Sequence, residues 1–178
     1  MDMLKVEIAQ DCAEIKSRLE AEGRFDFSDY RRASSQTRMA MVAAAAAAAG
    51  DMSRWAVVGW NGGGCVRENR AYWDDYVSAG RETARGSLFV PTLPSIPACE
   101  AAIAVGAHAE CAYYRTPPDT REISEIVEDL MASSPRVDGV VVVESDPERA
   151  VAVRVPRGNR LPHGFRSLKE VTLMRKEC

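Results

Sequence analysis

The side chains in this sequence that are best able to do chemistry are its cysteines and histidines. His108 and His163 are its only histidines, and isolated histidines are more often surface or core residues than catalysts. His108 stands three residues before Cys111, but two ligands do not make a metal site. The cysteines are odd in number, are scattered and form no CxxC pair: Cys12, Cys65, Cys99, Cys111 and Cys178. This pattern is typical of reduced thiols in a cytoplasmic protein, so we predict no metal and no cofactor.

A glycine-rich turn is the second chemical candidate. Trp55 to Trp60 is a continuous apolar run of strand length, which indicates a strand buried on both faces. Asn61-Gly62-Gly63-Gly64 follows directly, and such a turn before a helix can hold a phosphate on free backbone amides. Neither GxGxxG nor GxxxxGK[ST] is present, so a plain tight turn is favoured over a nucleotide site.

The elements that position these residues alternate between strand and helix, which favours an α/β layered sheet. Ser34 or Ser35 can cap the second helix, whose seven consecutive alanines have no polar face, so we expect close packing on two sides. The patterns predict helices at 11–22, 36–49, 66–79, 96–105 and from 119 to Pro135, and strands at 3–8, 55–60, 111–115, 137–143, 150–155 and 165–175.

The helix that begins at Asp119 or Thr120 is strongly amphipathic. Its apolar stripe is Ile123, Ile126, Val127, Leu130 and Met131. Its opposite face carries Arg121, Glu122, Glu125, Glu128 and Asp129. Since unpaired charges are costly to bury, we expect this helix to be covered on one side only.

Length and charge narrow the class of protein. The sequence has 178 residues and a net charge of −3, which predicts one domain over residues 1–178. Charges of both signs are spread along the chain without a basic stripe, so no nucleic-acid partner is expected. The longest apolar run, Met39 to Ala49, has eleven residues and is too short to span a bilayer. The amino-terminal residues lack an apolar signal-peptide core, and we expect a cytoplasmic protein with no membrane contact.

Residues Gln36 to Glu144 resemble the N-terminal half of β-ketoacyl synthases, the condensing enzymes of fatty-acid and polyketide synthesis, which have the thiolase fold. In that family a buried strand and a glycine turn precede a segment of the type FxxTxPNxxAxxxAIxxGxxGPxxxxxTAC. The corresponding stretches here are Trp55–Gly64, FVPTLPSIPA at 89–98, AAIAVG at 101–106 and RVDGVVVV at 136–143. The resemblance implies an α/β, thiolase-like half-domain over 1–178, with a mixed sheet of about five strands and helices on its faces.

The sequence departs from the family at two features that the family's catalytic reaction needs. The family's strand ends in Thr-Ala-Cys, and the cysteine attacks an acyl thioester from a helix N-terminus, where the pKa of a thiol is lowered. Thr116, Pro117 and Pro118 take these positions here, and Cys111 lies some five residues back. The family's two catalytic histidines come from a C-terminal half, and neither histidine here lies in a matching motif. The sequence therefore predicts no catalytic residues and no second half-domain.

The resemblance implies three functions, which the sequence leaves open. The first is a non-catalytic accessory or interaction subunit of a fatty-acid or polyketide-type pathway. The family pairs through the strand before the nucleophile, so Cys111, Tyr113, Tyr114 and Arg115 are expected at a homodimer interface or at one with a full-length ketosynthase. The second is an enzyme with cysteine-independent chemistry. The third is an acyl-thioester or acyl-carrier-protein binder with a remnant pocket near Phe89, Thr116 and Pro118.

Overall fold

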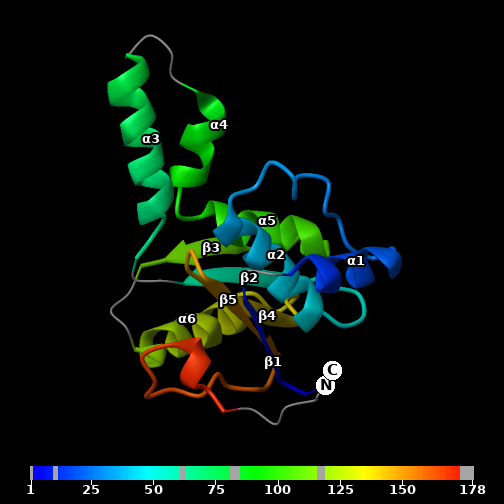
Figure 1. The fold of residues 1–178 in the computed structure, drawn as a ribbon. Helices are drawn as coiled ribbons and strands as arrows, with labels where there is room; N and C mark the ends of the chain where they lie inside the picture. The colour runs from blue at the N-terminus through cyan, green and yellow to red at the C-terminus, as the bar shows by residue number, and fades with distance from the viewer. Residues whose placement is uncertain (1, 10–11, 61–62, 81–84, 116–118, 173–178) are drawn as a thin grey trace.

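The computed structural model describes residues 2–9, 12–60, 63–80, 85–115 and 119–172, and its strands form one mixed five-stranded sheet. The strands are β1 (Leu4–Ala9), β2 (Trp55–Trp60), β3 (Cys111–Tyr114), β4 (Gly139–Ser145) and β5 (Arg149–Pro156), in the order β1-β5-β4-β2-β3. The strands β3, β2 and β4 are parallel, whereas β5 is antiparallel to both β4 and β1. The strands β1 and β3 therefore lie at the two edges of the sheet (Figure 1).

The helix α2 (Ser35–Ala47) is the centre of the core on one face of the sheet, beside α5 (Ile96–Val105) and α1 (Ala13–Ala21). The Ser34 side chain accepts a hydrogen bond from the Thr37 N–H and caps α2, as predicted. The alanines are small enough for α2 to pack closely on α5, on β5 and on β1. The expectation of close packing on two sides is confirmed.

The other face of the sheet is covered by α6 (Thr120–Ser133) and by the segment after β5. The apolar stripe of α6 packs on β4, β2 and β5, with Ile126 only partly buried. On the opposite face Arg121, Glu122, Glu125 and Asp129 are exposed, and Glu128 is half-buried. Leu161, Leu168 and Val171 of the following segment are at most 1% exposed and complete the same core. The prediction that α6 is covered on one side only is confirmed.

The helices α3 (Val66–Ala79) and α4 (Gly86–Phe89) project away from the sheet as an arm, which the short 3₁₀ helix η2 (Val90–Thr92) joins to α5 (Figure 1). None of the residues of α3 is buried. Among the described residues, no single helix is long and apolar enough to cross a bilayer, although Gly86–Thr92 and Ile96–Val105 reach that length together, bent by 92°.

Most predicted elements are present, and the sheet has five strands, the number that the resemblance implied. The strand predicted at 165–175 is wrong over its described part, which contains the 3₁₀ helix η3 (Leu168–Glu170). Phe165, Leu168 and Val171 are spaced by three residues rather than by two, so they do not share one face of a strand. The Ser167 side chain accepts a hydrogen bond from the Lys169 N–H and fixes the turn.

Candidate functional site

The carboxyl ends of the parallel strands β3, β2 and β4 lie side by side at one end of the sheet, which is the usual place for a site in an α/β fold. Tyr114, Trp60 and Glu144 lie in one row there, because Trp60 is in register with both of the others. Thr116, Pro117 and Pro118, which occupy the expected nucleophile junction, follow Tyr114 and lie outside the described residues. The site must therefore be read from the groups around that junction.

The amino terminus of α6 is occupied by groups of the chain itself. The Asp119 carboxylate accepts a hydrogen bond from the Arg121 N–H at 2.8 Å. The Thr120 N–H donates to the Phe165 carbonyl oxygen at 2.7 Å, and the Phe165 N–H donates to the Thr120 hydroxyl oxygen at 3.1 Å. A helix terminus stabilises a thiolate through free N–H groups. Two of those groups are already satisfied here, and one of them by a carboxylate.

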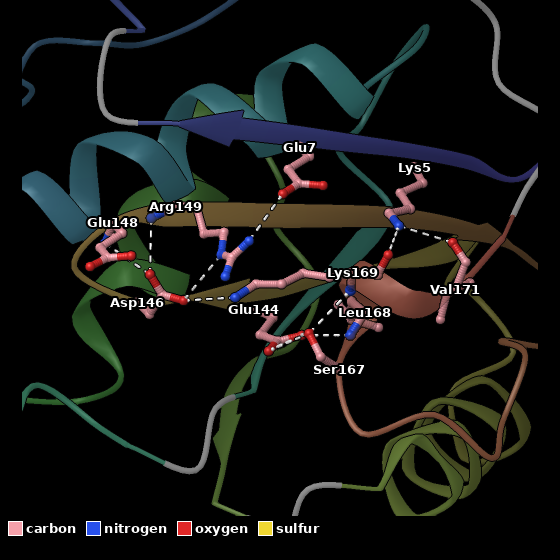
Figure 2. A network of polar contacts seen from close by, with 10 residues as sticks. All are labelled: Lys5, Glu7, Glu144, Asp146, Glu148, Arg149, Ser167, Leu168, Lys169 and Val171. Carbon is pink, nitrogen blue, oxygen red and sulfur yellow. Dashed lines mark hydrogen bonds and ion pairs between the residues drawn. The ribbon is translucent and has the colours of Figure 1, made fainter.

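The Glu144 carboxylate anchors η3 to the end of β4 (Figure 2). It accepts hydrogen bonds from the Ser167 hydroxyl at 2.9 Å and from the Leu168 N–H at 2.6 Å. Burial raises the pKa of Glu144, and these hydrogen bonds and the Lys169 charge oppose the rise only in part. Since both of its oxygens accept hydrogen bonds from η3, Glu144 serves the fold rather than an acid–base pair.

Two lysines complete this network (Figure 2). The Lys169 ammonium lies 2.9 Å from the Asp146 carboxylate, and Lys5 of β1 donates to the carbonyl oxygens of Val171, at 3.0 Å, and of Lys169. Partial burial of Asp146 works against its ionisation, but Lys169 and the N–H groups of Glu148 and Arg149 lower its pKa. The network ties the segment after β5 to two strands of the sheet.

The structure places Phe89 and the two histidines on separate segments of the chain. Phe89, on α4, is 48% exposed, and its ring packs edge-on against Tyr72 at 5.7 Å. With Thr116 and Pro118 undescribed, the remnant pocket stays a prediction. The His108 N–H donates to the Ser53 carbonyl at the amino end of β3, whereas the exposed His163 lies two residues before Phe165. The described residues contain no group of three or more potential metal ligands.

The predicted dimer strand lies at the free edge of the sheet, because β3 pairs with β2 alone among the described strands. Cys111 and Arg115 are exposed, and Tyr113 and Tyr114 are half-buried. Burial raises the pKa of Tyr113, and the Cys65 thiol at the base of α3 adds to the rise. The arm therefore begins directly beside the edge strand.

The arm presents apolar side chains to solvent next to this edge. Val66, Trp73 and Val77 of α3 are 61%, 61% and 63% exposed, and Phe89 and Val90 are close to half exposed. We call these five residues the arm face. Side chains of this size at such exposure mark interaction sites when they are contiguous. The sequence showed a helix here but gave no sign that its apolar residues stay uncovered.

A pocket of about 500 Å³ lies between the amino terminus of α2 and the segment that leads into α5. Its walls include Ala33, Val90, Pro91, Ile96 and the Glu100 side chain. The Glu100 Oε2 atom is buried without a hydrogen-bond partner among the described residues, and burial together with Asp29 and Asp26 raises the pKa of Glu100. Glu100 was visible in the sequence as the one charge on an apolar helix, but the other residues carried no signal.

Among known proteins, solved structures share the fold of this chain. No protein-family model and no curated protein matches the sequence. A solved ketosynthase in complex with its chain length factor, from Xenorhabdus doucetiae, matches with a TM-score of 0.59 and 14% identity, over 89% of this chain and 78% of that chain. The ishigamide ketosynthase/chain length factor matches with a TM-score of 0.56 and 12% identity, over 91% of this chain and 64% of that chain.

The chain thus has a ketosynthase-like, thiolase-type α/β fold, as the resemblance in its sequence predicted.

Proposed function

Starting from this ketosynthase-like fold, we propose that the chain is a non-catalytic accessory subunit that pairs with a ketosynthase in a fatty-acid or polyketide-type pathway. The observation that carries the proposal is the free edge of β3 beside the exposed arm face. An edge strand can extend its sheet by pairing with a strand of a second chain, and the arm face adds apolar area to the same contact.

The closure of the α6 terminus supports the absence of catalysis. A condensing enzyme needs free N–H groups there, and Asp119 and Phe165 take up two of them. The sequence adds Pro118 at the position of the nucleophile. His108 precedes the amino end of β3, whereas Thr120 comes after its carboxyl end.

The choice of partner rests on the two solved structures, which contain a ketosynthase together with a chain length factor. We therefore favour a heterodimer of this chain with a ketosynthase over a homodimer. We also propose that the chain works in the cytoplasm and contacts neither nucleic acid nor a membrane.

Co-expression tests this pairing directly. The full chain, carrying an affinity tag, is produced with each ketosynthase encoded in its source genome, and complexes are weighed by light scattering. We expect a one-to-one complex with one ketosynthase. Replacing Trp73 and Val77 by serine should weaken retention by about tenfold or more, since buried aromatic anchors dominate such contacts.

The matched control is Glu125→Ser on the exposed face of α6, which lies on the opposite side of the sheet from the arm (Figure 1). It should leave retention unchanged. A chain that stays monomeric with every ketosynthase would contradict the proposal, and a stable homodimer that excludes ketosynthases would contradict the choice of partner. Turnover of acyl or malonyl thioesters by the chain alone would contradict the non-catalytic role.

A second candidate function is acyl-chain or acyl-carrier binding in the pocket of about 500 Å³. Its size suits a small ligand, and its apolar walls suit an alkyl chain. Titration with a fluorescent fatty acid tests this function, and Ile96→Glu, which places a charge in the pocket wall, should abolish binding. Equal binding by wild type and variant would exclude the pocket.

A further inference from the structure

Two cysteines that are far apart in the sequence meet at the edge of the sheet. The Cys111 thiol, at the first residue of β3, lies 3.8 Å from the Cys99 sulfur on α5. Cys111 is exposed, and Cys99 is partly buried. A disulfide needs its two sulfurs at about 2.05 Å, so side-chain rotation over a short distance would close this one.

The positions of both sulfurs are set by regular structure. The helix α5 packs on β2 and on β3, and it ends at Gly106, whose left-handed φ of 67° turns the chain back into β3. The Ala107 N–H donates to the Ala102 carbonyl at 2.9 Å and closes that turn. The two thiols therefore face each other as a consequence of the fold.

The other described cysteines lie in different surroundings. Cys12 is 3% exposed, and its sulfur lies 3.2 Å from the Tyr30 hydroxyl. Cys65 is 2% exposed, and burial together with the Glu68 carboxylate raises its pKa to about 11. Both thiols are shielded from reagents in the folded protein, so a reagent in solution meets Cys111 first.

We propose that Cys99 and Cys111 form a redox-active dithiol that closes reversibly to a disulfide between α5 and β3. The oxidant is a small disulfide such as glutathione disulfide. The Cys111 thiolate attacks it, releases one thiol and forms a mixed disulfide; the Cys99 thiolate then displaces the second thiol. The protein loses two hydrogen atoms, and the oxidant, which gains two electrons and two protons, leaves as two thiols.

The reaction is slow at neutral pH, and its structural effect is limited to one edge of the sheet. Partial burial of the Cys111 sulfur and the Cys99 thiol beside it raise the pKa of Cys111 to about 12, although the residue as a whole is exposed. Thiolate is therefore scarce at neutral pH, which slows the attack on the oxidant. The cross-link joins the amino end of the edge strand to α5 and restrains that strand. The reaction concerns the unpaired chain, because the proposed pairing with a ketosynthase would cover the β3 edge that carries Cys111.

Mass spectrometry tests the proposal. The folded full-length chain, with Cys178→Ser to remove the remaining thiol, is incubated with glutathione disulfide, alkylated with N-ethylmaleimide and digested. We expect one peptide pair linked through Cys99 and Cys111, which dithiothreitol separates, while Cys12 and Cys65 are alkylated only after unfolding. Cys99→Ser should instead keep glutathione on Cys111, since no second thiol displaces it.

Phenylarsine oxide gives a second measurement that needs no oxidant, because trivalent arsenic binds two adjacent thiols at once. One arsenical should bind per chain, and Cys99→Ser and Cys111→Ser should each weaken binding by at least tenfold. Glutathione that accumulates on Cys111 of the chain with both thiols, a cross-link between two copies, or single variants that bind the arsenical as tightly as the chain with both thiols would overturn the proposal.

Discussion

Gly59, the second-last residue of β2, lies against α5 without space for a side chain. A Cβ at this position would lie 2.7 Å from the Ala98 Cβ and 3.4 Å from the Tyr113 ring. Contacts become ordinary only from 3.4 Å, so Gly59→Ala is short of space by 0.7 Å against Ala98. Neither atom ends a flexible side chain, and the helix itself must move.

The expected cost follows from this geometry. Overpacking of a close-packed core lowers the free energy of unfolding by about 1–3 kcal/mol. Ala98→Gly alone should cost about 1 kcal/mol, since glycine is that much less favourable than alanine inside a helix. The double variant exchanges the two side chains across the same contact and should cost less than the sum of the two single changes.

Urea unfolding at equilibrium measures all three variants, and the linkage of Cys99 to Cys111 gives a second measurement. Cys99 follows Ala98 directly, so a displaced α5 carries its sulfur away from Cys111. Gly59→Ala should slow formation of the disulfide, and the double variant should restore it. The close contact would be refuted if the costs of the two single variants added strictly in the double variant, or if Gly59→Ala lowered the free energy of unfolding by less than about 0.5 kcal/mol.

Three further predictions concern the polar groups that fix the second face. Glu144→Ala leaves the Leu168 N–H unpaired and should lower the free energy of unfolding by about 1–3 kcal/mol in urea titrations, whereas Glu144→Gln, which keeps one acceptor, should cost less. The raised pKa of Glu144 means that its stabilising effect is fully present below its ordinary value of 4.5 and is lost as pH rises through the folded value. Wild type should therefore gain stability relative to Glu144→Gln as pH falls from neutral toward 4.5, and a constant difference would contradict this. Asp119→Ala removes the cap of α6 and should lower the free energy of unfolding by about 1 kcal/mol. A lower midpoint of thermal unfolding would report this loss.

The predicted elements are those whose signals are local. The glycine turn before it predicts the helix Val66–Ala79, and the proline in its first turn predicts the helix Ile96–Val105. A glycine follows the last residue of each helix and marks its end. The turn at Leu168–Glu170 could not be predicted in this way, because the Glu144 carboxylate that fixes it lies 24 residues earlier in the chain. Sequence spacing alone gave a strand there.

The site was harder to predict than the fold, because its groups come from separate elements. Cys99 and Cys111 meet only once α5 has packed over β2 and β3, and the exposure of Trp73 depends on an arm that leaves the sheet. The charged face of α6, by contrast, was predicted correctly, since burial of its carboxylates without partners would be costly.

The covering of the two faces of the sheet bears on the contact surface that we propose. One face of the sheet is buried by α1, α2 and α5, and the other by α6 with Leu161, Leu168 and Val171, so both faces are already covered by the chain itself. A partner has little to gain there, because α6 turns charges outward. The strand β3, which pairs with β2 alone among the described strands, and the arm face still combine a sheet edge with exposed apolar area. If the chain acts through another protein, association at this side of the sheet gains the most free energy.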